Sequence, residues 1–174
     1  MNITRYLILA ATTGICCMAL AAGAIAAGPA LIETVKDWDA FRLAEGKSRT
    51  CYMRSAPVSS EPAGAKRGEI SLFITHRTGD KTRNEVSVLA GYTYKPASPV
   101  TITIGKSKFK LFTDGDTAWV EIPKDEAALI GAMRIGSQLT ISGTSSRGTK
   151  TTDRYSLSGF SGALKAINKA CGIK

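Results

Sequence analysis

The sequence predicts an all-β domain with a minor helical part. We expect a twisted β-sandwich of about eight or nine short antiparallel strands, one short internal helix and a C-terminal helix. Apolar and polar residues alternate with a period of two over most of the chain after residue 27. Turn residues separate these runs at short intervals, and only two segments change to a helical period. A partly open barrel is the alternative arrangement, and no internal repeat or second domain is visible.

Residues 1–27 are expected to be a signal peptide. Arg5 is the single charged residue of this segment, and a long apolar run follows it. The run ends in small residues, and an A-x-A pattern places cleavage at about Ala26 and Ala27. An uncleaved membrane anchor is the alternative, because the uncharged run is long enough to span a bilayer. Either outcome leaves residues 28–37 as a linker and 38–174 as one domain beyond the inner membrane.

The alternating segments begin after this linker. In Glu69–His76 the inward positions are apolar until the final histidine, and Val100–Ile104 alternates between β-branched residues. Asp114-Gly115 is a hairpin signal between two of the segments. The loop at 57–66 is rich in Ser, Pro, Ala and Gly. The predicted strands are Trp38–Leu43, Arg49–Ser55, Glu69–His76, Glu85–Tyr92, Val100–Ile104, Lys108–Phe112, Thr117–Ile122, Gln138–Ser142 and Thr151–Leu157.

Two segments have a helical period instead. Pro123–Arg134 begins with a proline suited to a first helical turn, carries acidic residues near its start and ends before Gly136. Phe160–Cys171 repeats apolar residues at helical spacing, with Ser158 placed to cap it. Its inward face includes Cys171.

The cysteines indicate the redox state of the compartment in which the protein folds, and the net charge indicates the kind of partner. Cys16 and Cys17 lie in the signal segment, so Cys51 and Cys171 are expected to form one disulfide in an oxidising compartment. Two buried free thiols are the alternative. The chain after residue 27 holds 22 basic and 14 acidic residues, a net charge of +8. Such a balance favours anionic partners, although the basic residues are scattered.

No catalytic constellation is visible, and we expect no enzyme activity, cofactor or metal site. His76 is the single histidine, and at a strand end it is expected to be a structural hydrogen-bonding residue. Asp114 and Asp116 flank a hairpin glycine, which is typical of a turn and not of an acid–base pair. Gly143–Thr149 is expected to be a turn, with an anion cradle of backbone amides as the lesser alternative.

Several motifs resemble the invasion-associated locus B family, small exported proteins of alphaproteobacteria. The resemblance runs from about Trp38 to Cys171, and the Tyr-Ser-Leu-x-Gly-Phe stretch before the last helix is its most specific part. It implies a periplasmic or outer-surface location, a β-sandwich-like fold and, in some pathogenic members, a link to host-cell invasion. It implies no reaction. The motifs are Asn84–Tyr92, Ala118-Trp119, Ala132–Gly136, Ser145–Thr149 and Asp153–Phe160.

The expected function is therefore non-enzymatic binding in the bacterial envelope, in host-cell invasion or another envelope role. The expected partner is another envelope protein or an anionic surface such as lipid or lipopolysaccharide, and not nucleic acid. A periplasmic small-ligand carrier and an envelope hydrolase are the alternatives. The hydrolase would need His76 or a carboxylate pair in a pocket. The expected location is the periplasm, with association with the outer membrane or secretion as alternatives.

Overall fold

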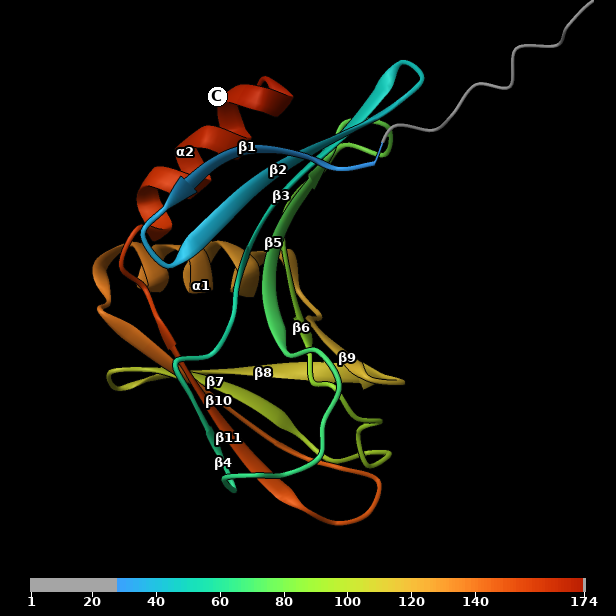
Figure 1. Ribbon diagram of the computed structural model, residues 1–174, viewed down its shortest axis with the longest axis vertical. Coiled ribbons are helices and arrows are strands. Elements are labelled where there is room, and N and C mark those ends of the chain that lie inside the picture. The colour runs from blue at the N-terminus through green and yellow to red at the C-terminus, as the bar shows by residue number, and fades with distance from the viewer. Residues whose placement is uncertain (1–27, 174) are drawn as a thin grey trace, which may run out of the picture.

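The computed structural model describes residues 28–173, which form one continuous antiparallel sheet with two helices (Figure 1). The spatial order of the eleven strands is β1-β2-β3-β5-β6-β9-β8-β7-β10-β11-β4. The helices are α1 (Pro123–Ile135) and α2 (Phe160–Cys171). The strands are β1 (Ala30–Val35), β2 (Trp38–Glu45), β3 (Ser48–Ser55), β4 (Ser59–Glu61), β5 (Ser71–Arg77), β6 (Thr82–Leu89), β7 (Val100–Ile104), β8 (Ser107–Asp114), β9 (Thr117–Val120), β10 (Gln138–Thr144) and β11 (Lys150–Ser156).

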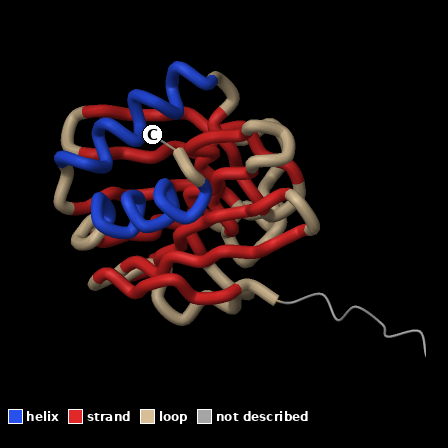
Figure 2. The backbone as a smooth tube through the Cα atoms, turned by 90° about the horizontal axis from the view of Figure 1, so that it is seen from above, coloured by secondary structure: helices blue, strands red, loops and turns tan. Residues whose placement is uncertain are grey.

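The sheet curves strongly, so that β1, β2 and β3 lie above β7, β10 and β11 in Figure 1. Both helices lie on its concave side, where α2 contacts β1, β2, β3 and β5 while α1 contacts β6, β8 and β9. Figure 2, turned by 90°, shows the two helices beside each other on one side of the strands. The concave face carries the core, which includes the fully buried Trp38, Met53, Ile74 and Leu164. The arrangement is sandwich-like, as predicted, although a single sheet forms it.

The nine predicted strands are all present, with ends that differ by a few residues. The expectation of eight or nine was too low, because β1 and β4 were missed. β1 lies within 28–37, expected to be a linker, and its side chains Leu31 and Ile32 are exposed, so no buried alternation marks it. β4 is three polar residues long and is held by pairing with β11. Pairing with a neighbouring strand, not an amphipathic pattern, makes both segments extended.

Both helices agree with the sequence prediction. In α1, Leu129, Ile130 and Met133 are buried, and Gly136 follows the helix with its N–H bonded to the Ala132 carbonyl at 2.9 Å. α2 has the predicted bounds, and its inward face is buried. The membrane-anchor question and the cleavage site at Ala26 and Ala27 lie outside the described residues. Within residues 28–173, neither helix is long and apolar enough to cross a membrane.

The turn into α2 differs from the expectation that Ser158 caps the helix. No side chain caps it, and the N-cap residue is Gly159, whose φ of 93° is left-handed. A Cβ on Gly159 would collide with the carbonyl oxygen of Val35. Only glycine fits both the backbone angle and this close approach. The glycine of the Tyr-Ser-Leu-x-Gly-Phe motif is therefore required by the packing of this turn against the end of β1.

The expected disulfide between Cys51 and Cys171 is present, with Cα atoms 6.0 Å apart. It joins β3 to the last residue of α2 across a sequence separation of 120 residues. Cys51 is fully buried and Cys171 nearly so. The bond therefore fixes the C-terminal helix onto the concave face of the early strands.

We expect the double substitution Cys51→Ala with Cys171→Ala to lower the free energy of unfolding by about 2–5 kcal/mol, because the unfolded chain loses the constraint of a long closed loop. Urea denaturation followed by circular dichroism measures the change. The unreduced wild-type protein should weigh about 2 Da less than its reduced form. Denaturation of the wild-type protein in reductant is the control and should reproduce the loss. Equal stability with and without the bond would contradict the expectation.

Candidate functional site

A buried ion pair joins two distant parts of the chain below a pocket with a basic rim. Arg67, between β4 and β5, donates from Nη1 and Nη2 to the two carboxylate oxygens of Asp153 on β11, each at 2.7 Å. The side chains of both residues are only 5% exposed. Arg67 Nε and Nη2 also donate to the carbonyl of Ala90, at 2.9 and 2.7 Å. Burial alone would lower the pKa of Arg67, but the hydrogen bonds to Asp153 and its charge raise that pKa.

Tyrosines surround this buried ion pair. The Arg67 guanidinium lies 4.9 Å from the ring centroid of Tyr92, a cation–π contact. The Tyr92 hydroxyl is 2.6 Å from the Thr151 hydroxyl, and its ring meets Tyr94 edge-on. Tyr155 is wholly buried, and its hydroxyl has no hydrogen-bond partner within the described chain. Burial raises the pKa of Tyr94 and Tyr155 far above the ordinary phenol value, so both rings stay neutral.

Two adjoining pockets open above the Arg67 side chain, with volumes of about 470 and 350 Å³. We call them together the basic pocket. No acidic residue lines either part, and Arg67 is neutralised by Asp153. Lys66 and Arg147, both exposed, are therefore its uncompensated cations. The residues that line both parts are Lys66, Arg67, Tyr92, Ser145 and Arg147.

The loop that carries Arg147 is a hydrogen-bonded turn. The amides of Ser145 and Gly148 donate to carbonyls within the turn, at 2.9 and 2.8 Å, and that of Ser146 donates to the Thr93 carbonyl at 2.8 Å. The Thr149 amide donates to the Ser145 hydroxyl at 3.1 Å. Because these amides already have acceptors, the prediction of a turn is confirmed and a cradle built from them is not formed. Any anion held here would depend on the side chains of the rim.

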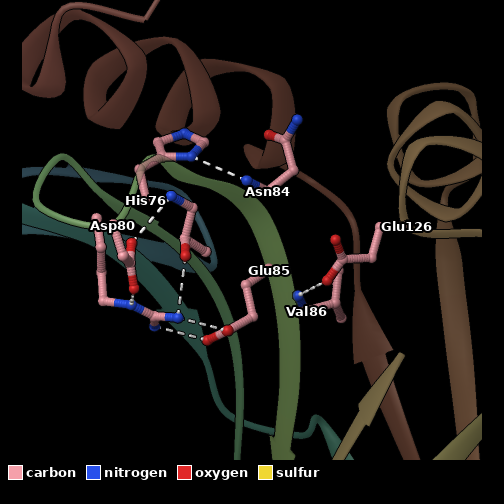
Figure 3. Close-up of polar contacts among 8 residues, drawn as sticks. His76, Asp80, Asn84, Glu85, Val86 and Glu126 are labelled. Carbon is pink, nitrogen blue, oxygen red and sulfur yellow. Dashed lines mark hydrogen bonds and ion pairs between the residues drawn. The ribbon is translucent and has the colours of Figure 1, made fainter. Parts of the chain in front are cut away.

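His76 is wholly buried and uses both ring nitrogens. Figure 3 shows Nδ1 accepting the backbone N–H of Asn84, at 3.0 Å. Nε2 lies 2.8 Å from Oδ1 of Asn168 on α2, so the proton is on Nε2 and is donated to that oxygen. Burial lowers the pKa of His76, an effect that the Asn168 bond opposes and the charge of Arg83 adds to. The expected structural role fits this geometry.

The carboxylates near His76 are also occupied. Arg77 donates from Nη1 and Nη2 to the two oxygens of Glu85, at 2.8 and 2.6 Å, and from Nε to Asp80 at 3.0 Å (Figure 3). Hydrogen bonds from Thr82, followed by that of Arg77, lower the pKa of Asp80 to about 2. Glu126 of α1 accepts the amide of Val86 at 3.2 Å, and burial raises its pKa. These groups fasten the β5–β6 hairpin and the start of α1.

Asp114 and Asp116 flank Gly115 in the turn between β8 and β9, as predicted. Gly115 has a φ of 60°, and the Asp116 carboxylate accepts a hydrogen bond from the Thr117 hydroxyl at 3.0 Å. Among residues 28–173, no group of three or more His, Cys, Asp or Glu side chains is arranged to hold a metal ion. A pocket of about 650 Å³ near Lys36 and Arg54 is larger than either part of the basic pocket, but it also contains Asp37, Asp39 and Glu69.

We expect Arg67→Met to lower the free energy of unfolding by about 3–5 kcal/mol, because it leaves the Asp153 carboxylate buried without a partner. Arg67→Met combined with Asp153→Leu should recover much of this loss, since no unpaired charge then remains. Urea denaturation of both variants measures the two changes. A single variant as stable as the wild-type protein would show that the ion pair is solvated in solution.

Mild acid should destabilise the fold through His76. The folded state holds its pKa below the ordinary value of about 6.5, so the unfolded state binds more protons as the pH falls. The urea midpoint should therefore drop as the pH is lowered through 6.5 and level off below the folded pKa. His76→Gln removes the titration and should flatten this part of the profile. A wild-type midpoint that stays constant between pH 7.5 and 5 would contradict the assignment.

Comparisons with known proteins identify the family. A sequence model described as "Invasion associated locus B (IalB) protein" matches residues 38–168. Neither the curated proteins nor the solved structures gave a match. The matched range runs from Trp38 through Asn168 and includes both members of the buried ion pair as well as the turn around Gly159. This match covers most of the chain, and the protein belongs to the invasion-associated locus B family.

Proposed function

We propose that this protein is an exported, non-enzymatic binding protein of the bacterial envelope that attaches to anionic surfaces through the basic pocket. The observation that carries the proposal is the pairing of charges in that pocket. Asp153 cancels the charge of Arg67, whereas Lys66 and Arg147 on the rim have no carboxylate beside them in the lining. A phosphate or carboxylate entering the pocket would meet two cations and the Ser145–Thr149 turn.

The location is proposed from the family and from the cysteines. Membership of this family implies an exported protein, and a disulfide is typical of oxidising compartments such as the periplasm. The bacterial outer surface and a host-cell surface both carry anionic groups. The same binding step would therefore serve an envelope role or attachment during host-cell invasion.

A binding role is favoured over catalysis because the reactive side chains have structural partners. Both nitrogens of His76 are bonded in the interior, and Cys51 and Cys171 are joined to each other. The carboxylates of Asp153 and Glu85 are each held bidentately by an arginine. An envelope hydrolase would need His76 or a carboxylate pair in a pocket. Of the carboxylates that line the pocket of about 650 Å³, Asp39 accepts the Thr34 hydroxyl at 2.7 Å and Glu69 pairs with Arg54 at 2.9 Å.

A small-ligand carrier is the second candidate, and the size of the basic pocket favours it. A volume of about 470 Å³ lies within the range typical of small-molecule sites. A carrier of a small anion would use the same Lys66 and Arg147 as a surface-binding protein. Inorganic phosphate should compete with anionic vesicles for the pocket of either a surface-binding protein or a carrier. Only a carrier should bind free phosphate tightly when no vesicles are present.

The test is flotation of the protein with vesicles of phosphatidylcholine, with and without phosphatidylglycerol. Binding to the anionic vesicles should be strong at 10 mM salt and fall steeply by 150 mM, as the Debye length shrinks from about 30 Å to about 8 Å. Lys66→Gln with Arg147→Gln should weaken binding about tenfold or more at low salt, since each cation near such a surface contributes about 1 kcal/mol.

The matched control is Lys124→Gln with Lys165→Gln, which removes the same charge from exposed positions on α1 and α2. Equal loss in both double variants would mean that net charge and not the basic pocket drives binding. Binding that is absent or insensitive to salt would exclude the anionic-surface role. Tight retention of free phosphate at 150 mM salt, measured by calorimetry, would favour the carrier.

A further inference from the structure

A row of aromatic side chains crosses the convex face of the sheet. In the strand register, Phe41 lies opposite Tyr52, and Trp119 lies opposite Phe112. Between these pairs, Phe73 lies opposite Ser87, which in turn lies opposite Trp119. The alternate positions on the same strands, such as Met53 and Ala118, are fully buried in the core. We call this the aromatic row: Phe41, Tyr52, Phe73, Trp119 and Phe112.

The rings of the row contact each other and remain accessible to solvent. Phe41 stacks on Tyr52 with centroids 5.1 Å apart, and Phe112 stacks on Trp119 at 5.7 Å. Tyr52 and Phe73 are 6.2 Å apart. Four of the rings are half-buried, and Phe112 is 47% exposed. Both helices lie on the opposite, concave side of the sheet (Figure 1), so neither helix covers the row.

Ser87 interrupts the row with a small side chain. Phe73 and Trp119 are two strands apart, which at about 4.8 Å per strand separates their backbones by about 10 Å. A flat ring can therefore be accommodated above Ser87 between two aromatic side chains. The full row spans six neighbouring strands, from β2 to β8, and is thus about 24 Å long. This shape suits an extended chain of rings more than a single compact ligand.

The charges around the row differ between its two ends. Beside Tyr52 and Phe73, the carboxylate of Glu69 pairs with Arg54 at 2.9 Å, and Arg54 lies over the Phe41 ring. Glu85 pairs with Arg77 on the same face. At the other end, Lys108 and Lys110 precede Phe112 on β8, share its face of the strand and have no ion-pair partner within residues 28–173. Acceptors for hydroxyl groups thus lie at one end and free cations at the other.

We infer that the aromatic row binds a polysaccharide chain that carries carboxylate groups on some of its sugars. The apolar faces of sugar rings stack on the aromatic side chains, and sugar hydroxyls donate to Glu69 and Glu85. A carboxylate of the chain pairs with Lys108 and Lys110. This site is separate from the basic pocket, and the inference does not depend on the function proposed for that pocket.

Charge favours a polysaccharide over single-stranded nucleic acid, which also uses aromatic and basic side chains. A nucleic acid has a phosphate at every residue and needs a cation along its whole length. At this end of the row Glu69 and Glu85 neutralise Arg54 and Arg77, so no free cation is offered there. A glycan with neutral sugars between acidic ones places hydroxyls there instead. Hydroxyl groups then lie beside the glutamates at one end of the row, and a carboxylate lies beside the lysines at the other.

The protein contains a built-in reporter for the experiment. It has two tryptophans, of which Trp38 is fully buried and Trp119 is half-buried in the row. Titration with hyaluronan oligosaccharides, in which carboxylated and neutral sugars alternate, should change the tryptophan fluorescence. Trp119→Phe should abolish the fluorescence change while calorimetry still detects binding, because an aromatic ring remains at this position.

Removal of single rings should weaken binding of the hyaluronan oligosaccharides. Trp119→Ala and Phe112→Ser are each expected to weaken it about 3- to 10-fold. Phe112→Ser is the safer variant for folding because this ring is the most exposed of the row. Lys108→Gln with Lys110→Gln should weaken hyaluronan binding but leave that of neutral chitin oligosaccharides unchanged, and Lys124→Gln with Lys165→Gln is the charge-matched control.

The following outcomes would contradict the inference. No calorimetric binding of hyaluronan, or binding that Phe112→Ser and Trp119→Ala leave unchanged, would show that the row is not a polysaccharide site. Tighter binding of oligothymidylate than of hyaluronan through the same residues would assign the row to nucleic acid. A dimer in solution that Phe112→Ser converts to monomer would assign the row to contact between two copies of this chain.

Discussion

The fold depends on one packing contact between the first strands and the start of the last helix. The sheet is a single ribbon whose outer strands, β1 and β4, do not pair with each other, so backbone pairing alone leaves it open. Trp38 closes it on one side: its indole N–H donates to the Ser156 carbonyl at 3.1 Å, and its ring meets Phe160 edge-on at 5.2 Å. The backbone of Gly159 rests against Val35 at the same place. These contacts press α2 onto the concave face, where the disulfide then holds its far end.

The buried ion pair provides a second connection to β11. Arg67 binds Asp153 on β11 and the carbonyl of Ala90 just after β6, so one side chain joins two strands that are not neighbours in the sheet. A buried ion pair contributes less to stability than to defining which groups meet, because both charges must be desolvated. The consequence for function is that the rim cations Lys66 and Arg147 lie beside a side chain, Arg67, that is held by four hydrogen bonds. A site for anions needs a side chain fixed in this way, since exposed charges on mobile chains bind weakly.

The sequence predicted most of the elements because a half-buried strand or helix leaves a periodic pattern. β1 and β4 left none, since their own side chains bury little and their neighbours hold them extended. The basic pocket could not be predicted from the sequence. Arg67 follows a loop rich in Ser, Pro and Gly, where no periodic pattern indicates that a side chain is buried. Asp153 did leave a signal: it shares the inward face of β11 with Thr151 and Tyr155, and an acid at such a position requires a partner. The aromatic row was similarly visible as rings on the outward side of strands, but only the strand order brings them together.

The disulfide has a consequence for the order in which the chain acquires its structure. A chain leaves the ribosome or a translocation channel from its N-terminus, so Cys51 emerges 120 residues before Cys171. Until then the β2–β3 hairpin exposes Trp38 and Met53, which α2 covers only at the end. The early strands therefore keep an apolar face exposed, and open to incorrect contacts, until α2 has been synthesised. Truncation near the C-terminus should accordingly be more damaging to this domain than its short helical segment suggests.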